Sequence, residues 1–239
     1  MSIFRFKQFE IKQDQCAMKI GTDGVLLGAW ATVAHAPNIL DIGTGTGVLA
    51  LMAAQRNPTA QIVAVEIEKQ AAEQAQYNIA RSPWTARVQL QQTAIQDFIS
   101  TEPFDAIISN PPYFEAAAST TIANEARQTA RTTSQLSYTE LLKAASNLLS
   151  DSGVFSLILP YTVGQQVLLL APTFHLFPCE IVAVSARIGK TPNRMLLALS
   201  KQKTPNIIER QLAIRKAGKG QQDYTAEFVA LHRDFLLAL

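Results

Sequence analysis

The chain has few of the residues that build metal sites, disulfide frameworks or histidine-based catalysis. Its 239 residues include two cysteines and three histidines, at Cys16, Cys179, His35, His175 and His232. None stands beside another at the spacing of a metal motif, and two isolated cysteines do not make a disulfide framework. We therefore expect reduced thiols, no metal and no catalytic triad centred on histidine.

Long apolar runs are also missing. No stretch of about eighteen apolar residues occurs, which argues against a membrane-spanning helix. The opening MSIFRFK lacks the apolar core of a secretion signal. We expect a cytoplasmic protein with no membrane partner and no evident protein partner. With 48% hydrophobic residues, the chain can bury one large core, so we expect a single domain over 1–239.

Short apolar runs alternate with helical patterns along most of the chain. They predict strands near 39–41, 62–66, 88–92, 106–109, 154–159, 180–186 and 195–199, with helices between the first five. No long helix separates the last two, which predicts a hairpin. The fold class is therefore α/β: a doubly wound, mostly parallel sheet of seven strands, with helices on both faces and a C-terminal β-hairpin.

Several helix boundaries carry recognisable signals. Ser137 and Glu140 form the pattern of a capping box, which predicts a helix over 138–149. Thr22 or Asp23 is suited to cap a helix over 25–31. Apolar residues at helical spacing over 224–239 predict a core-facing C-terminal helix.

A glycine-rich loop, DIGTGTG, occupies 41–47 directly after the first predicted strand. Glycines let the backbone turn sharply and approach a ligand closely, and the N-terminus of the helix that begins at Val48 faces the same spot. A dinucleotide motif of the form G-x-G-x-x-G would need glycine where Val48 stands. The loop therefore favours a ligand without a pyrophosphate.

Glu66 ends the second predicted strand. In a doubly wound sheet, that position lies beside the first glycine loop, so Glu66 can accept hydrogen bonds from two vicinal ribose hydroxyls. The alternative is a surface carboxylate that opens a helix over 68–80.

Asn110-Pro111-Pro112-Tyr113 follows the apolar run of the fourth strand. The Asn110 side-chain oxygen and the Pro111 carbonyl can accept the two hydrogens of a planar NH₂ group. Tyr113 offers a ring on which a base can stack, an interaction of about 1–3 kcal/mol. The alternative is an ordinary proline-rich turn.

Together these motifs resemble the class I S-adenosyl-L-methionine-dependent N-methyltransferases, over nearly the whole chain. The resemblance implies that 41–47, notably Asp41, Gly43, Gly45 and Gly47, holds the amino acid end of the cofactor. It also implies that Glu66 holds the ribose and that 110–113 holds the target nitrogen and forms the catalytic site.

Two further cofactor contacts follow from the resemblance. Many relatives carry an aspartate after the third strand, where this chain has Ala94, so the adenine would meet backbone groups at Ala94 and Ile95, or Asp97 in a shifted register. The segment 1–38 resembles an element that closes over the cofactor, with Lys19, Thr22 and Asp23 in contact.

Basic residues suggest a second partner, although the net charge is only +2. We predict that 114–135, with Arg127 and Arg131, is a substrate lid. Lys190 and a run over 201–219 could bind phosphates; the run comprises Lys201, Lys203, Arg210, Arg215, Lys216 and Lys219. The alternative is a solvated surface loop and helix face.

The compact layout most resembles the bacterial tRNA1(Val) (adenine-N6)-methyltransferase family, which implies a tRNA partner and methylation of N6 of adenosine 37. Protein glutamine N5-methyltransferases, DNA adenine methyltransferases and rRNA guanine-N2 methyltransferases use a similar motif and stay as alternatives. A cofactor-binding module without catalysis would need no amine-holding motif, so Asn110 argues against it.

Overall fold

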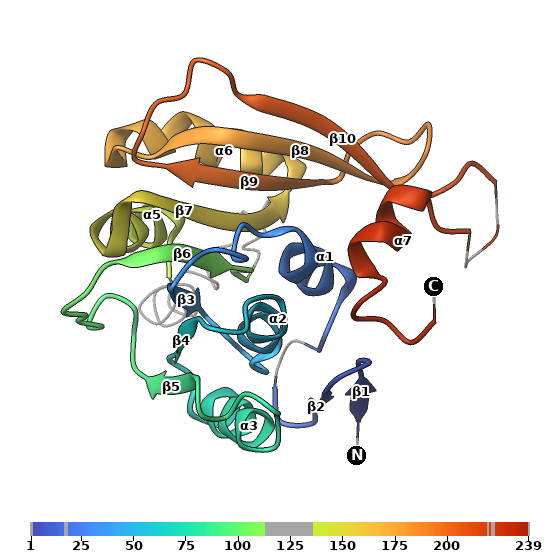
Figure 1. Ribbon diagram of the computed structural model, residues 1–239. Helices are drawn as coiled ribbons and strands as arrows, with labels where there is room; N and C mark the ends of the chain where they lie inside the picture. The colour runs from blue at the N-terminus through green and yellow to red at the C-terminus, as the bar shows by residue number, and fades with distance from the viewer. Residues whose placement is uncertain (1, 17–18, 113–135, 219, 221–222, 239) are drawn as a thin grey trace, which may run out of the picture.

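The computed structural model describes residues 2–16, 19–112, 136–218, 220 and 223–238. Its centre is an eight-stranded sheet of order β10-β8-β9-β7-β6-β3-β4-β5, with helices on both faces (Figure 1). The strands are β3 (Asn38–Ile42), β4 (Gln61–Glu66), β5 (Val88–Gln92), β6 (Phe104–Ser109), β7 (Leu149–Pro160), β8 (Phe177–Arg187), β9 (Arg194–Ser200) and β10 (Ile208–Arg215). The predicted α/β class with a mostly parallel sheet and a closing β8–β9 hairpin is confirmed.

The strand count differs from the prediction by one. The additional strand is β10, which pairs in parallel with β8 inside the stretch expected to be a surface loop and helix. The sequence did not predict β10 because the strand lies at the edge of the sheet and its first half is exposed. Leu212 is its one fully buried residue, and Glu209, Arg210 and Gln211 precede it. Such a strand lacks the apolar alternation by which strands are recognised.

Strand directions decide which loops share an edge of the sheet. β9 runs antiparallel to both β7 and β8, whereas β7 is parallel to β6 and β10 is parallel to β8. β8 and β10 therefore end at the same edge as β3, β4 and β6. We call this the carboxyl edge.

The helices are α1 (Thr22–Trp30), α2 (Val48–Arg56), α3 (Lys69–Ala80), α5 (Tyr138–Leu148), α6 (Tyr161–Leu170) and α7 (Ala226–His232), with a short 3-10 helix η2 (Ala171–Phe174). The capping box is confirmed: Ser137 Oγ accepts from the Glu140 backbone N–H, and Glu140 Oε2 accepts from the Ser137 N–H. The predicted caps of α1 are wrong, because Gly21 is the N-cap and Thr22 and Asp23 lie in the first turn. The C-terminal helix is shorter than predicted.

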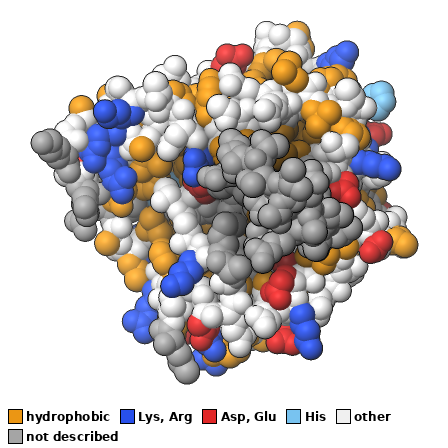
Figure 2. Space-filling view, turned by 180° about the vertical axis from the view of Figure 1, so that it is seen from behind, with side chains coloured by type: hydrophobic (Ala, Val, Ile, Leu, Met, Phe, Trp, Pro, Cys, Tyr) orange, Lys and Arg blue, Asp and Glu red, His pale blue; other side chains and the backbone are white. Residues whose placement is uncertain are grey.

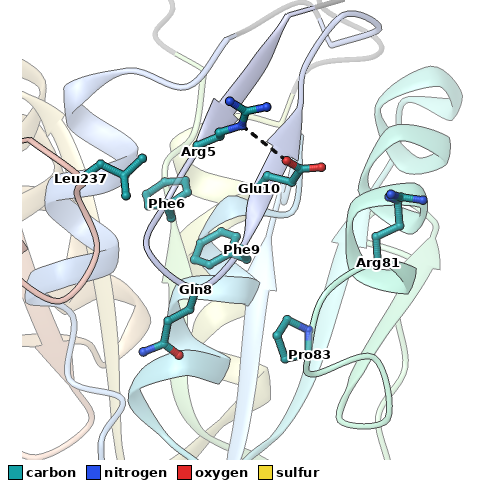
Figure 3. A pocket seen from close by; sticks show the side chains of 8 residues that line it. All are labelled: Arg5, Phe6, Gln8, Phe9, Glu10, Arg81, Pro83 and Leu237. Atoms are coloured by element: carbon teal, nitrogen blue, oxygen red, sulfur yellow. Dashed lines mark ion pairs between the residues drawn. The ribbon is translucent and has the colours of Figure 1, made fainter.

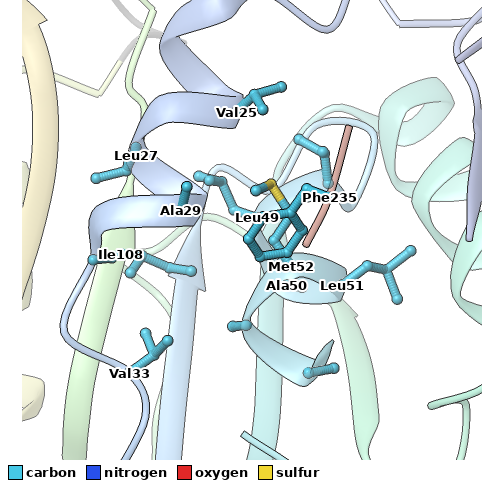
Figure 4. Packing of buried hydrophobic residues seen from close by; sticks show 14 of the residues in the cluster. Val25, Leu27, Ala29, Val33, Leu49, Ala50, Leu51, Met52, Ile108 and Phe235 are labelled. Atoms are coloured by element: carbon cyan, nitrogen blue, oxygen red, sulfur yellow. The ribbon is translucent and has the colours of Figure 1, made fainter. Parts of the chain in front are cut away.

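α1 packs closely on α2, and this contact sets where the N-terminus of α1 lies. Side chains of both helices meet Ile108 and Phe235 in one buried cluster (Figure 4). At Gly28, an added Cβ would lie 2.5 Å from the Met52 sulfur and 3.2 Å from its Cβ. The missing side chain at position 28 therefore permits the close approach of the two helices.

The N-terminal residues form a separate two-stranded sheet that the sequence did not predict. β1 (Ile3–Arg5) pairs antiparallel with β2 (Glu10–Lys12). Phe6 and Phe9 in the connection stack with ring centroids 4.3 Å apart and are buried in the main core. Through these two rings, the hairpin packs against the main core, which positions the segment between β2 and α1.

Candidate active site

The glycine loop is held against the end of β4. The backbone N–H groups of Gly43 and Thr44 both donate to the Val65 carbonyl, at 2.9 and 3.0 Å. Gly43, Gly45 and Gly47 have φ values of 70°, 55° and 84°, which favour glycine. An added Cβ would meet nothing within 4 Å at Gly43 or Gly45. Open space therefore lies beside the first part of the loop.

Asp41 joins the glycine loop to the start of α2. Its Oδ2 accepts from Thr44 Oγ1 at 2.6 Å and from the Ala50 N–H at 3.1 Å. Among the described residues, its Oδ1 has no hydrogen-bond partner although it is buried. Burial raises the pKa of Asp41 to about 7; the charge of Glu66 raises it further, and the two hydrogen bonds oppose the rise.

Glu66 lies against the glycine loop, as predicted. Its side chain is buried; Oε2 accepts from the Gly45 N–H and Oε1 from the Glu68 N–H, both at 2.9 Å. The alternative of a surface carboxylate that opens the next helix is wrong, because Glu68 is the N-cap of α3. The two carboxylate oxygens are thus oriented by backbone groups and keep further lone pairs.

The turn after β5 lies beside Glu66. The Thr93 N–H donates to the Glu66 carbonyl at 3.0 Å, and the Asp97 N–H donates to Ala94 at 3.0 Å. Ile95 points into the core, Ala94 is half-buried and Asp97 is exposed. The turn therefore offers its backbone near Glu66, whereas no contact links Asp97 to that carboxylate.

Asn110 follows β6 at the carboxyl edge, next to the N-terminus of α1. The buried Ser109 hydroxyl donates to the Ile42 carbonyl at 2.9 Å, which ties the end of β6 to the end of β3. An added Cβ at Gly24 would lie 3.7 Å from the Asn110 amide nitrogen, so the two residues are neighbours. Pro111 is buried and Pro112 is exposed. Tyr113, Arg127, Arg131 and the predicted lid 114–135 lie outside the described residues.

The segment before α1 passes beside the same site. Burial, with the charges of Glu66, Glu68 and Asp14, raises the pKa of the Cys16 thiol to about 11. Lys19 and Thr22 are exposed, and no contact links them to the glycine loop. Asp23 is half-buried and forms an ion pair with Arg194, with 2.7 Å between Oδ2 and Nε.

Three residues that sequence reasoning missed also position this site. Asn78 of α3 donates to the Thr46 carbonyl at 2.8 Å, and Arg194 holds the first turn of α1. Ile67, directly after Glu66, is 54% exposed, which is high for a large apolar side chain. For these three residues, the sequence carried one signal, an isoleucine placed between two glutamates at the end of a predicted strand.

Two pockets in the described residues are lined by neither the glycine loop, Glu66 nor Asn110. The larger, of about 470 Å³, is near the β1–β2 turn and contains an Arg5–Glu10 ion pair of 3.7 Å (Figure 3). Arg81 at the end of α3 borders it, whereas the glycine loop faces the start of that helix. The second pocket, of about 280 Å³, lies between the turn after β5 and α5.

Three of the predicted phosphate-binding residues lie at one edge of the sheet. Lys190, Arg215 and Lys216 lie at the carboxyl edge, and Lys219 is outside the described residues.

Within the residues that the structure describes, no group of His, Cys, Asp or Glu side chains is arranged to hold a metal ion. No helix in those same ranges is long and apolar enough to cross a membrane.

Comparisons with known proteins agree with this geometry. A family model described as the methyltransferase small domain matches residues 18–182. A tRNA1(Val) (adenine(37)-N6)-methyltransferase of Haemophilus influenzae is 48% identical over 99% of both chains. One of the same name from Bacteroides thetaiotaomicron is 43% identical over 99% of this chain and 98% of its own. A solved predicted O-methyltransferase from Agrobacterium tumefaciens has a TM-score of 0.67 at 20% identity, over 89% of this chain and 96% of that one, and shows the fold alone.

The fold and the family model define a Rossmann-like methyltransferase, as the sequence motifs predicted. The chain belongs to the methyltransferase small domain family and, by its near full-length relatives, to the tRNA1(Val) (adenine(37)-N6)-methyltransferase family.

Proposed function

We propose that this protein methylates the exocyclic N6 of an adenosine in tRNA, at position 37 of tRNA1(Val), with S-adenosyl-L-methionine as methyl donor. The proposal depends above all on Asn110, which follows β6 beside Gly24, at the edge that carries the glycine loop and Glu66. The shared name of relatives 43% and 48% identical over almost the whole chain supports this substrate. A cytoplasmic location follows from a tRNA substrate.

The chemistry of the site fits this cofactor. Asp41 has a buried oxygen without a described partner, so a nearby cationic amino group would satisfy the Asp41 carboxylate. Glu66 presents oriented oxygens for two ribose hydroxyls, and open space lies beside Gly43 and Gly45. When bound, the cofactor supplies a methyl group on a sulfonium sulfur.

The adenine ring would lie between Ile67 and the turn after β5. Ile67 offers exposed apolar surface, and the backbone at Ala94 and Ile95 offers hydrogen-bonding groups in place of the usual aspartate. Asp97 is a weaker candidate because it is exposed and no contact links it to Glu66. The segment 1–38, which borders the site, would close over the cofactor and bring Lys19, Thr22 and Asp23 into contact with it.

The target amine would be held by the motif that begins at Asn110. The adenine N6 lone pair is delocalised into the ring, so the enzyme must orient it toward the methyl group. The Asn110 side-chain oxygen and the Pro111 carbonyl would do so by accepting both N–H hydrogens. Their dipoles also stabilise the positive charge that develops on nitrogen during transfer. No strong base is needed, because the methylated ammonium is very acidic.

The geometry also sets a requirement on the RNA. A base stacked among its neighbours cannot bring its exocyclic amine to the end of β6, so adenosine 37 would have to leave the stack. We propose that Pro112 stiffens the motif and that Tyr113 stacks on the extruded base. We also propose that 114–135, with Arg127 and Arg131, covers the bound substrate.

A transfer assay tests the proposal directly. The purified protein is incubated with methyl-labelled cofactor and either unmodified total tRNA or a glutamine-containing release factor, and the labelled product is digested and identified. We expect N6-methyladenosine from tRNA alone. Asn110→Ala should lower transfer roughly 100-fold or more while cofactor affinity stays within a factor of two. Labelled glutamine would instead support the protein-methylating alternative.

A further inference from the structure

The basic run of 201–219 does not form one surface in the folded protein. Lys201 donates to the Leu149 carbonyl at 2.7 Å, and Lys203 lies 4.7 Å from the centre of the Phe177 ring. Both follow β9, which runs opposite to its neighbours, so they lie at the edge remote from Asn110. Arg210 forms an ion pair with Glu180 within the sheet.

The fold instead gathers cations from two distant parts of the sequence at the carboxyl edge. Arg187 ends β8 and pairs in register with Arg215 at the end of β10. Lys190 and Lys216 follow these two strand ends and are exposed. We call these four residues the basic edge. Figure 2 shows Lys and Arg side chains gathered toward the left of the view, on one face of the molecule.

Hydrogen bonds hold the basic edge in a fixed shape. The Arg187 guanidinium donates to the carbonyls of Lys216 and Gly220, at 3.0 and 2.9 Å, and the Ile188 N–H donates to the Arg215 carbonyl at 2.9 Å. The Arg215 guanidinium lies 5.5 Å from the centre of the Tyr224 ring. The two arginines and the backbone that carries the two lysines are therefore held in place before any ligand arrives, which reduces the entropy lost on binding.

The charge of this surface is not cancelled by its carboxylates. Among the described residues, the ammonium groups of Lys190 and Lys216 have no ion-pair or hydrogen-bond partner. Asp223 lies in the adjoining loop, where its backbone carbonyl accepts from the Lys216 N–H, and Asp23 is engaged by Arg194. The charges of Lys190 and Lys216 are therefore not used in ion pairs within the described residues.

A series of contacts also connects the basic edge to Asn110, the residue proposed to hold the amine. Arg194 begins β9 directly after the loop that carries Lys190. It pairs with Asp23, whose neighbour Gly24 lies against Asn110. The basic edge and Asn110 are therefore parts of one face.

We propose that the basic edge binds the phosphate backbone of the tRNA and sets the position from which the target adenosine reaches Asn110. This inference rests on the proposed function, and it names the surface by which that substrate would be held. A lysine that contacts a phosphate releases counterions from the RNA on binding. Replacing that lysine by a neutral residue therefore reduces the salt dependence of binding.

The test compares two double variants with equal loss of charge. Lys190→Gln/Lys216→Gln alters the basic edge, and Lys203→Gln/Arg81→Gln alters exposed cations at the remote edge. Binding of unmodified tRNA is measured from 50 to 300 mM salt, together with melting temperature and cofactor affinity. We expect the first variant to lower the slope of log K against log salt by about 1.4–1.8. The control should keep the wild-type slope, and both should keep their melting temperature and cofactor affinity.

Failure of this inference differs from failure of the proposed function. If the wild type methylates tRNA but the basic-edge variant keeps its slope, or the control lowers it equally, the inference is overturned and the function stands. If the wild type binds tRNA with a slope that only the basic-edge variant reduces, yet transfers no methyl group to tRNA, the surface stands and the function does not. A wild type that neither binds nor methylates tRNA overturns both.

Discussion

Asn78 and Thr46 are joined by a hydrogen bond of 2.8 Å, from a buried side-chain amide of α3 to a carbonyl of the glycine loop. The same amide nitrogen donates to the Lys12 carbonyl, and its oxygen accepts from the Lys12 N–H, both at 2.9 Å. One side chain therefore connects the loop, the N-terminal segment and α3. The Asn78 amide is thus a hydrogen-bond partner of the Lys12 N–H, the Lys12 carbonyl and the Thr46 carbonyl.

Replacing Asn78 should loosen the N-terminal segment and the glycine loop together. Asn78→Ala leaves backbone groups of Lys12 and Thr46 without a partner, so we expect a loss of roughly 2–4 kcal/mol in unfolding free energy. Cofactor binding should weaken as well. Urea unfolding and calorimetric titration measure the two effects. Gln96→Ala is the control, because Gln96 bonds Glu140 at the surface; equal losses in both variants would contradict the role of Asn78.

Asp41 should make stability depend on pH. Burial raises its folded pKa to about 7 from an ordinary 3.8, so the folded state holds the proton more tightly than the unfolded chain does. The stability this provides is complete below about pH 3.8 and is lost as the pH rises through 7. Asp41→Asn removes that dependence. As the pH rises from 3.8 to 7, the unfolding free energy of the variant minus that of the wild type should therefore increase, by at most about 1.4 kcal/mol per pH unit.

Urea unfolding at pH 5, 6, 7 and 8 tests this prediction. Asp97→Asn, at an exposed position, is the control and should follow the wild type. A constant difference between Asp41→Asn and the wild type across the series would mean that Asp41 ionises normally. A bound cationic ligand beside Asp41 should stabilise the carboxylate, so the wild type should release a proton on cofactor binding near neutral pH.

The sequence predicted the parts of the site that local patterns specify. The glycine loop, Glu66 and Asn110 each follow a strand, and parallel strands deliver their carboxyl ends to one edge, so their meeting could be inferred. The role of Asn78 could not, because its partner Lys12 lies 66 residues away and no pattern marks the contact. The division of the basic run between two edges of the sheet could not be inferred either, because charge spacing along the chain does not reveal the reversal of β9.

Gly28 should not tolerate alanine, although alanine favours helix by about 1 kcal/mol. The added Cβ would meet buried atoms of Met52, so we expect overpacking to destabilise Gly28→Ala by about 1–3 kcal/mol. Gly24→Ala in the same helix meets its neighbours at 3.7 and 3.9 Å, ordinary contacts, and should be neutral or slightly stabilising. Thermal unfolding of both variants is the measurement, and similar shifts in the two would refute the packing argument.

The ion pair of Asp23 and Arg194 should matter more for turnover than for stability. It links the first turn of α1 to β9 while both side chains stay partly exposed, so we expect a coupling of about 1 kcal/mol in a double-mutant cycle with Asp23→Asn and Arg194→Gln. Gly24 lies against Asn110, so movement of that turn should lower methyl transfer to tRNA in either single variant. Arg210→Gln breaks the Glu180 pair within the sheet and should leave transfer unchanged. Equal transfer by Arg194→Gln and Arg210→Gln would show that the first turn of α1 does not position Asn110.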